Sequence, residues 1–574
     1  MQKIFNYILI TVFTLSASAI MAQERDKDTI GTDVVNVVKA YTPTIADAFK
    51  IKETPNLNDS TNLQKKEIKY NIFSIPVAST FAPAKGRAAT VNKEKPVKLY
   101  DNYASLGVGS YTTVLGEVYL NHELSRDERV GGYFSHHSSQ GEIEDVNFDN
   151  NFSETGLNAH YIKNERDFNW KVEGGFQLQA YNWYGLPDQD VETFDVDHSF
   201  YTANIGGNIN FEDAIFKKAS VLYRRFGDNQ DSGENRFLLK SGFDVPVNGQ
   251  EIDTKLTIDY LGGNFDRSII IDEALNYGNF NVGLAPTYQF IQDDLTLNLG
   301  VNLVYFNDTE ASDSKFFIYP NITASYRLVD DVMIAFGGIQ GELIQNSYYD
   351  FAQANPFVSP TLYITPTDQA YNVSAGIKGK LSNAMSYSIS GKYQSDNNRA
   401  LFKSNPSFST APESYQFGNS FGVVYDDLKT FSIGGALNVD LNRNLKVGLK
   451  ADYFTYNSDV EAEAWNLPDI EASAFVDYQI DQHWFAGATV FYMGERKDQL
   501  TVGSGLVTPQ TFTFETVTLD SYFDANAHVG YKINDRLSAY IKGNNLAGKN
   551  YNRWLNYPVQ GIQFLAGATY QFDF

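Results

Sequence analysis

Apolar and polar side chains alternate along most of this chain, from about Asn102 to the C-terminal Phe574. The last segment shows this most clearly, because every second residue from Ile562 onward is apolar or small, while most residues between them are polar. The segment from Asn444 to Tyr453 repeats the pattern. A period of two places alternate side chains on opposite faces of a β-strand. The sequence therefore predicts strands whose two faces meet different solvents.

Soluble β-sandwiches also alternate, so three further features are needed to choose a membrane barrel. The alternating segments run for roughly 10 to 15 residues, longer than the usual soluble strand and long enough to cross a bilayer at a tilt. Short turns alternate with long loops, as in outer-membrane barrels. Aromatic residues gather at segment ends, where an interfacial girdle is expected. These aromatic groups are Tyr133-Phe134, Tyr181 to Tyr184, Tyr348-Tyr349 and Trp484-Phe485.

The short turns allow the strands to be counted. Asp426-Asp427 resembles a further turn, but accepting it gives an odd strand count, so we treat about Tyr415 to Leu441 as one long strand. With both chain ends on the periplasmic side, the sequence predicts an all-β transmembrane antiparallel β-barrel of about 22 strands, an even number as bacterial barrels have. The ten turns lie near Arg126, Glu165, Asp213, Asn248, Asp293, Asp330, Asn383, Asn442, Gln482 and Asp535.

The first hundred residues differ from the rest. Residues 1–22 contain Lys3, a short apolar stretch and small residues up to Ala22, which is the pattern of a secretory signal peptide. Residues 23–100 hold charged clusters and proline without sustained alternation, and we expect a mostly irregular periplasmic arm. Residues 101–574 then form the predicted barrel, which places the protein in the outer membrane of a Gram-negative bacterium.

Charge and composition exclude several classes of function. The chain carries 45 Lys and Arg against 69 Asp and Glu, a net charge of −24, which disfavours a nucleic-acid partner. It has no Cys, so disulfides, thiol nucleophiles and thiolate metal sites are excluded. The mean hydropathy of −0.32 and the lack of repeated long apolar runs exclude a bundle of membrane helices.

Two groups of residues could carry chemistry. His136 and His137 are flanked by serines, but no nucleophile motif accompanies them, so a surface or lumen position is the simpler interpretation. The acidic stretch from Asp188 to Asp197 offers oxygen ligands for Ca²⁺ but lacks the glycine of a calcium loop, which favours a solvated loop. We predict no enzymatic activity and no cofactor or metal.

The C-terminal region resembles TonB-dependent receptors. The stretch Tyr540 to Tyr551, which contains Asn545-Leu546, and the last strand ending at Phe574 are similar to the end of that family's barrel. The Trp465 to Pro468 loop is similar to receptor-like barrels of the Bacteroidetes. The resemblance implies a receptor- or transporter-like barrel that passes or binds a solute.

The N-terminal arm departs from this family, because fewer than 80 residues separate the signal peptide from the first strand and none resemble a plug domain. The run Asp33, Val34, Val35, Asn36, Val37 and Val38 resembles a TonB box, the strand that pairs with the periplasmic TonB protein. A simple hydrophobic anchor or extra strand explains the same residues. The alternative function is therefore a plug-less scaffold or assembly subunit that binds other periplasmic or outer-membrane proteins.

The last strand also resembles the signal by which the outer-membrane assembly machinery recognises its clients. Gly567 is followed by aromatic residues at every second position, namely Tyr570, Phe572 and Phe574. Recognition through an open strand edge needs this extended pattern. We expect these aromatic residues to face membrane lipid once the strand is paired.

Overall fold

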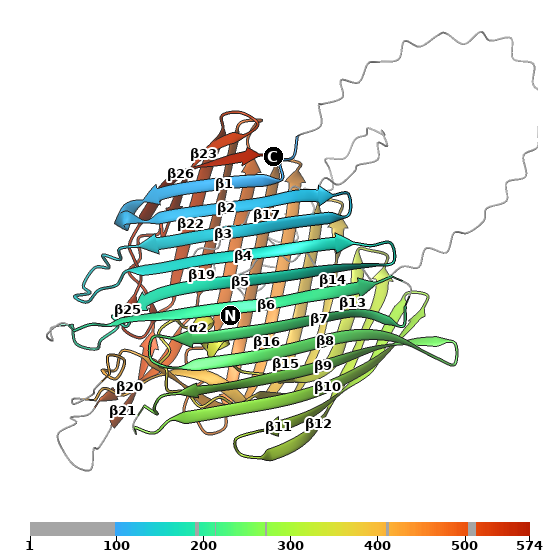
Figure 1. Ribbon diagram of the computed structural model, residues 1–574, viewed down its shortest axis with the longest axis horizontal. Coiled ribbons are helices and arrows are strands. Elements are labelled where there is room, and N and C mark those ends of the chain that lie inside the picture. The colour runs from blue at the N-terminus through green and yellow to red at the C-terminus, as the bar shows by residue number, and fades with distance from the viewer. Residues whose placement is uncertain (1–97, 190–193, 213, 270–271, 409–412, 503–512) are drawn as a thin grey trace, which may run out of the picture. The chain divides into compact units, whose positions relative to one another are not determined.

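A 22-stranded antiparallel sheet makes up most of the molecule (Figure 1). The computed structural model describes residues 98–574 except residues 190–193, 213, 270–271, 409–412 and 503–512. The first eleven wall strands are β1 (Asn102–Gly109), β2 (Val114–Ser125), β3 (Glu128–Ser139), β4 (Phe152–Asn164), β5 (Phe168–Asn182), β6 (Asp197–Phe211), β7 (Phe216–Asp228), β8 (Gly233–Val247), β9 (Gln250–Phe265), β10 (Leu275–Gln292) and β11 (Leu295–Asp308). The others are β12 (Asp313–Val329), β13 (Met333–Ile344), β14 (Thr367–Ser382), β15 (Met385–Ser404), β16 (Phe421–Asn442), β17 (Leu445–Ser458), β18 (Ile470–Gln479), β19 (Trp484–Met493), β22 (Tyr522–Lys532), β23 (Leu537–Asn544) and β26 (Gln563–Phe572).

The sheet closes on itself between its first and last strands. Strand β1 pairs with β2 on one side and with β26 on the other, so that Leu106 lies opposite both Gly116 and Ala568. A closed ring leaves no strand edge with unpaired backbone groups, which is the condition for crossing lipid with strands. The predicted fold class, a closed antiparallel barrel of 22 strands, is confirmed.

The connections are all short at one end of the barrel, whereas most of those at the other end are long. At the end that we call the short-turn end, each of the ten predicted turns falls on or beside a connection between wall strands. The turn at Asn248-Gly249 shows the local cause, since both residues have positive φ (50° and 80°), the geometry of the tight hairpin turns that Asn-Gly favours. The opposite end, which we call the long-loop end, carries every other connection.

The long-loop connections contain the remaining elements. These are η1 (Ser110–Thr112), α2 (Tyr348–Ala354), the hairpin of β20 (Arg496–Val502) with β21 (Thr513–Leu519), and the small hairpin of β24 (Asn552–Trp554) with β25 (Tyr557–Pro558). Within the described residues, no helix is long and apolar enough to cross a membrane. The predicted signal peptide and nearly all of the predicted arm lie outside the described residues and remain predictions.

Strand β16 resolves the ambiguity at Asp426-Asp427. Both residues lie inside this strand, which runs from Phe421 to Asn442, so they form no turn. The Asp426 carboxylate instead accepts hydrogen bonds from the backbone N–H groups of Val460 and Glu461 in the β17–β18 loop. Asp-Asp pairs favour turns because carboxylates bond to nearby N–H groups, and here the donors come from another loop.

The two faces of the wall differ in polarity. Outward-facing Leu157, Ile205, Ile433, Leu449 and Ile541 are exposed large apolar side chains, which are costly in water but suit contact with acyl chains. The inward positions of β17 carry Lys446, Lys450 and Asp452. Such a polar interior and apolar exterior are typical of outer-membrane barrels.

The predicted aromatic girdle is largely wrong. Of the four groups, only the one at Trp484 begins a strand with an exposed side chain. The aromatic residues from Tyr181 to Tyr184 and at Tyr348 are buried at the long-loop end, and Tyr133-Phe134 lie in the middle of β3. The sequence pattern marked strand ends correctly in part, but it could not show that loops fold back and bury these rings away from lipid.

Adjacent residues of β19 test the assignment of the two faces. Val490 is exposed and points outward, whereas Thr489 points into the lumen. We expect Val490→Arg to destabilise the folded barrel by roughly 2–4 kcal/mol, because a lipid-facing guanidinium loses its hydration. The matched variant Thr489→Arg should cost at most about 1 kcal/mol because its side chain stays in water. Denaturant unfolding of both variants in lipid vesicles measures the difference, and equal losses would contradict the assigned faces.

Candidate functional site: a cap of loops inside the barrel mouth

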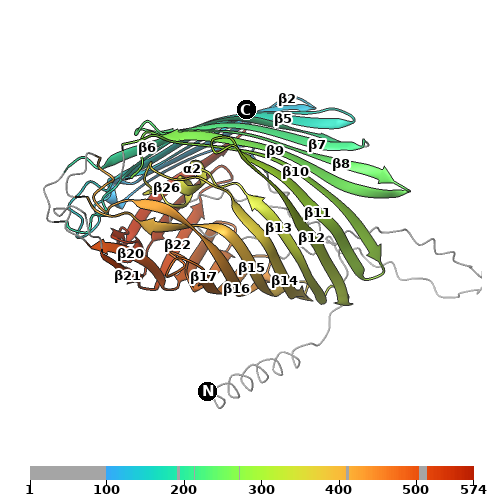
Figure 2. The ribbon, with the colours of Figure 1, turned by 90° about the horizontal axis from the view of Figure 1, so that it is seen from below.

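The β13–β14 loop, residues 345–366, folds into the barrel at the long-loop end. Figure 2 shows its helix α2 between opposite parts of the strand wall. Ser347 caps α2, because its hydroxyl accepts a hydrogen bond from Asp350 N (3.0 Å) and donates to the Asp350 carboxylate (2.5 Å). A seven-residue helix is too short to be stable alone, so packing against the wall must hold it.

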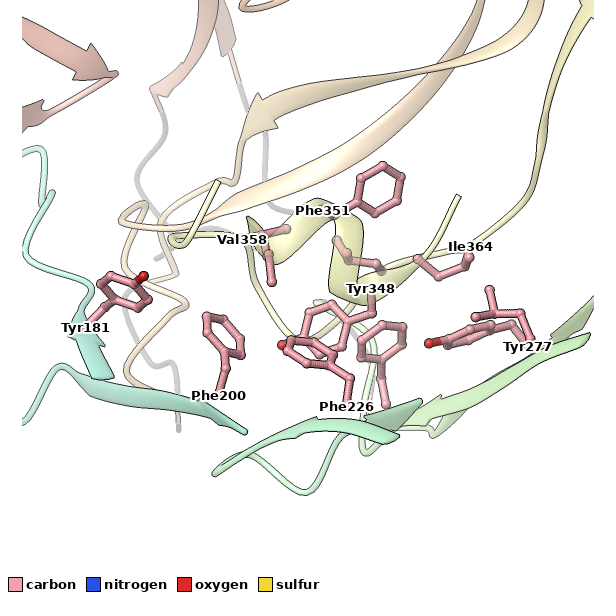
Figure 3. Close-up of a cluster of buried hydrophobic side chains, with 12 residues drawn as sticks. Tyr181, Phe200, Phe226, Tyr277, Tyr348, Phe351, Val358 and Ile364 are labelled. Carbon is pink, nitrogen blue, oxygen red and sulfur yellow. The ribbon is translucent and has the colours of Figure 1, made fainter. Parts of the chain in front are cut away.

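An apolar cluster provides that packing. Tyr348, Phe351 and Ala352 of α2 are buried against the inner faces of five wall strands (Figure 3). The ring of Tyr348 lies 5.0 Å from that of Phe226 and 4.9 Å from that of Phe265, both edge to face. The wall residues of this cluster are Tyr181, Phe200, Phe226, Leu261, Phe265 and Tyr277, and the rest of the loop adds Val358, Leu362 and Ile364.

A buried carboxylate fixes the start of α2. Glu234 of β8 has no solvent-exposed surface, and it accepts hydrogen bonds from the backbone N–H of Tyr348 (2.6 Å) and the hydroxyl of Tyr277 (3.0 Å). Arg224 of β7 lies 3.5 Å from its other oxygen. A carboxylate at the first turn of a helix meets the unpaired N–H groups and the positive end of the helix dipole. Glu234 therefore joins the wall to the loop through contacts that water cannot replace.

Three further contacts secure the helix. The Tyr348 hydroxyl donates to Asp228 (2.7 Å), and burial raises the pKa of this phenol well above its ordinary range. The Arg224 guanidinium stacks 3.7 Å from the Tyr349 ring centroid, a cation–π contact. Arg236 binds Asp259 through two hydrogen bonds and reaches Asp350 at 3.6 Å. Apolar packing, hydrogen bonds and ionic contacts thus all hold the helix against the wall.

A second cluster joins loops from opposite sides of the ring. Trp183 and Tyr184 come from the β5–β6 loop, while Tyr415 comes from the β15–β16 loop. Asn419 Nδ2 donates to the carbonyl of Trp183 (2.8 Å), and the ring of Tyr557 stacks 3.7 Å from that of Phe357. Because these loops leave the wall about half a ring apart, their contacts span the mouth. We call residues 345–366 and the described parts of loops 183–196, 405–420 and 545–562 the cap.

At the long-loop end, the β17–β18 loop and the β20–β21 hairpin cover the extended ends of β15 and β16. Trp465 is buried against Leu401 and Leu428, and its indole N–H donates to Glu461 (2.7 Å). Asp498 of β20 is fully buried and accepts a hydrogen bond from Ser404 N (3.0 Å). Burial raises the pKa of Asp498 to about 6.

Below the cap, the lumen wall of β10 to β13 is lined by amides and hydroxyls. Asn298 donates to Thr323 (2.9 Å) and accepts from Gln289 (3.0 Å), while Asn302 donates to the Gly341 carbonyl (2.8 Å). Side chains of this kind bind polar molecules through hydrogen bonds but carry no charge. This wall suits the passage of a hydrated polar solute.

The structure places the residues of the C-terminal resemblance in supporting positions. Asn545 has positive φ (46°), and its amide donates to the carbonyls of Lys549 (3.0 Å) and Gln560 (2.9 Å), which shapes the last loop. Tyr551 stacks on Tyr522 at 3.7 Å and donates to Asp524 (2.8 Å). Tyr570 and Phe574 are exposed on the outward side of β26, as expected for the assembly signal, whose recognition remains a prediction.

The remaining candidate residues either lie outside the described part of the chain or are not brought together by the fold. Asp33 to Val38 lie outside the described residues. His136 and His137 point to opposite faces of β3, because His136 pairs with Gly116 and His137 with Leu115. Part of the acidic stretch from Asp188 to Asp197 is outside the described residues, and in the remainder of the described chain no group of three metal-binding side chains is arranged around a common point. The sequence missed Glu234 and Arg224, since single charges in strands carry no motif.

No protein-family model and no curated protein matches this sequence. Solved structures match its fold. The ferripyoverdine receptor of the outer membrane of Pseudomonas aeruginosa, bound to ferripyoverdine, is 15% identical, with a TM-score of 0.60 over 84% of this chain and 73% of the receptor. The FrpB iron transporter of Neisseria meningitidis is 11% identical, with a TM-score of 0.61 over 83% and 82%.

A third match is the ferric-catecholate import receptor Fiu of E. coli, at 11% identity, with a TM-score of 0.59 over 82% of each chain. At such identities the likeness concerns the fold. The chain has the closed β-barrel fold of these outer-membrane proteins.

The Glu234 contact can be tested with a thiol probe, because the chain has no natural Cys. In the variant Ala352→Cys, the thiol replaces a buried methyl group on the face of α2 that packs against the wall, so maleimide should react slowly. We expect Glu234→Ala to raise the labelling rate at least about tenfold, because it leaves Arg224 and two hydrogen-bond donors unpaired, a loss of order 3–5 kcal/mol. Glu251→Ala, at an exposed turn, is the control. Equal rates in all three proteins would show that Glu234 does not hold the loop.

The pKa of Asp498 predicts a pH effect on the β20–β21 hairpin. Its folded-state pKa of about 6 exceeds the ordinary value of 3.8, so the hairpin is most stable below about pH 4 and loses stability as pH rises through 6. We expect a spin label at Thr516→Cys to become more mobile between pH 5 and pH 7.5. Asp498→Asn should abolish this change, because an amide does not ionise. A pH response that persists in that variant would assign it to another group.

Proposed function

We propose that this protein is a receptor that admits a polar solute through its lumen, with residues 345–366 as the gate. The observation that carries the proposal is the insertion of this loop into the barrel mouth, where Glu234 and the apolar cluster hold it. The proteins with the same fold are described as a receptor bound to ferripyoverdine, an iron transporter and a ferric-catecholate import receptor. For this chain, the amide and hydroxyl side chains that line β10 to β13 support a hydrated polar solute without specifying which.

The loop is built so that it could move without breaking the wall. It leaves β13 at Ile344 and returns to β14 at Thr367, and these two strands pair directly with each other. Both ends of the loop are therefore anchored at one point of the ring. Its contacts with β5 to β10 are side-chain packing and a few hydrogen bonds, and no strand pairing joins it to that wall. Release would cost those contacts and the contacts of the loop with β16 and the last loop, namely the Val358–Phe421 β-bridge and the stacking of Phe357 on Tyr557.

The N-terminal arm would supply the energy coupling in this proposal. The described chain begins at Lys98, whose ammonium pairs with Asp573 (2.9 Å) at the short-turn end, the end that faces the periplasm in outer-membrane barrels. A TonB box at Asp33 to Val38 would then be on the side where TonB binds. Without a recognisable plug domain between that box and the barrel, the cap takes the role of closing the lumen.

The alternative is a scaffold that holds other outer-membrane or periplasmic proteins. The β20–β21 hairpin favours it, because this hairpin forms a sheet separate from the wall and exposes Phe514. An exposed aromatic residue on a two-stranded sheet with free edges is a feature of protein-binding surfaces.

Conductance of the purified full-length chain in planar bilayers tests the gate. We expect little current from the native protein and a large open current when residues 349–362 are replaced by a short Gly-Ser linker, since the wall is unchanged. The control removes residues 503–512 from the β20–β21 hairpin, which should leave the current low. If the gate variant also stays closed, another segment blocks the lumen and the proposal fails.

Val35→Pro tests the TonB link. Proline removes an amide donor and cannot continue a paired strand, so energy-dependent uptake should be lost while the barrel remains in the membrane. Val35→Ala keeps the amide and should retain uptake. Unchanged function in the proline variant, together with loss of a bound periplasmic protein after deletion of residues 24–95, would favour the scaffold.

A further inference from the structure

A groove crosses the outward face of the wall where the barrel closes. It has a volume of about 420 Å³ and lies over β26, β1, β2 and β3. Sites for single small molecules are typically about 300–1,000 Å³. The residues that line it are Ala104, Ser105, Leu106, Gly116, Glu117, Val118, Phe134, Leu537, Ala568 and Tyr570.

Small side chains at neighbouring outward positions produce the hollow. Leu106 lies between Gly116 on one side and Ala568 on the other, and Ala104 occupies the next outward position of β1. A Cβ atom at Gly116 would meet no other atom within 4 Å, so the space beside it is open. Phe134 and Tyr570 stand at its borders. The groove belongs to the apolar outer surface, where acyl chains are the surrounding solvent.

The end of the groove nearest the short turns carries a cation and aromatic rings. Leu537 and Tyr570 lie opposite each other in the β23–β26 pairing, and Arg536 precedes Leu537 in the turn. The Arg536 guanidinium is exposed and lies 5.6 Å from the ring centroid of Tyr100. In the part of the chain that the structure describes, no carboxylate lies within ion-pair distance of Arg536. Tyrosine and arginine at this level of a barrel face lipid headgroups.

We propose that this groove binds one phospholipid, with an acyl chain along Gly116 and Ala568 and the phosphate at Arg536. The apolar lining excludes a polar solute, and the exposed guanidinium of Arg536 at one end complements a phosphate. A stable protein partner would need about 800 Å² of its own surface, which a groove of this size cannot supply alone. The proposal is independent of whether the lumen carries a solute.

Two variants separate the chain-binding and phosphate-binding parts. Gly116→Leu places a large side chain in the groove at a position where the Cβ meets no other atom, and Arg536→Gln removes the charge while keeping a long side chain. Two controls are matched to them. Gly391→Leu adds the same side chain at an outward position of β15 that is similarly open, and Arg443→Gln removes an exposed arginine from the β16–β17 turn.

The full-length protein is extracted in detergent, and native mass spectrometry with dipalmitoyl phosphatidylethanolamine as the probe counts the lipids retained. We expect one lipid on the native protein and on both controls, at least tenfold weaker retention in Gly116→Leu, and several-fold weaker retention in Arg536→Gln. Heat-modifiable migration on gels verifies that each barrel is folded. If Gly116→Leu fails to fold, Arg536→Gln and its control still decide the question.

Equal retention in all folded variants would overturn the proposal, because the lipid would then bind the outward face of the wall without preference for the groove. Retention of the lipid in Gly116→Leu with loss in both arginine variants would also overturn it, since headgroup charge alone would explain the binding. Recovery of a stoichiometric protein on the native chain but not on Gly116→Leu would assign the groove to a protein partner instead.

Discussion

Backbone hydrogen bonding in lipid is the constraint on which the structure depends. The membrane interior offers no partner to an N–H or C=O group, so each wall strand must be paired on both sides. The first and last strands of the wall, β1 and β26, have a sequence neighbour on one side only, and they meet this requirement by pairing with each other. All other pairings join strands that follow each other in the chain or that flank the β20–β21 or the β24–β25 hairpin. Closure also explains why strand number, turn spacing and face alternation are so regular.

The barrel encloses a wide lumen, which is an open aqueous path unless segments of the protein block it. The cap is made from loops that the wall does not need, and it is held by contacts of a different kind. Buried aromatic rings supply apolar packing, while Glu234 pairs groups of the helix and of the wall that would otherwise be unsatisfied. Burying such a carboxylate is costly unless every partner is present, so the cap has one well-defined bound position.

The outward groove follows from the same geometry as closure. Where the first and last strands meet, Gly116 and Ala568 flank Leu106, and these small residues leave a hollow in the outward face. At other outward positions of the wall, large apolar side chains occupy the corresponding space. The seam is also where the assembly-signal residues Tyr570 and Phe574 face outward. The same strand thus closes the ring and presents apolar side chains on its outward face.

The sequence by itself determined the wall. Alternation of period two, ten polar turns and an even strand count follow from local backbone rules and from the two solvents, so they can be read along the chain. It did not determine the cap, because the partners Glu234 and Tyr348 are 114 residues apart and belong to no motif. Tyr181 and Tyr348 suggested an interfacial girdle, because the sequence does not show that both are buried where the β13–β14 loop packs against the wall. Which loops fold inward is decided by packing across the ring, which only the tertiary structure contains.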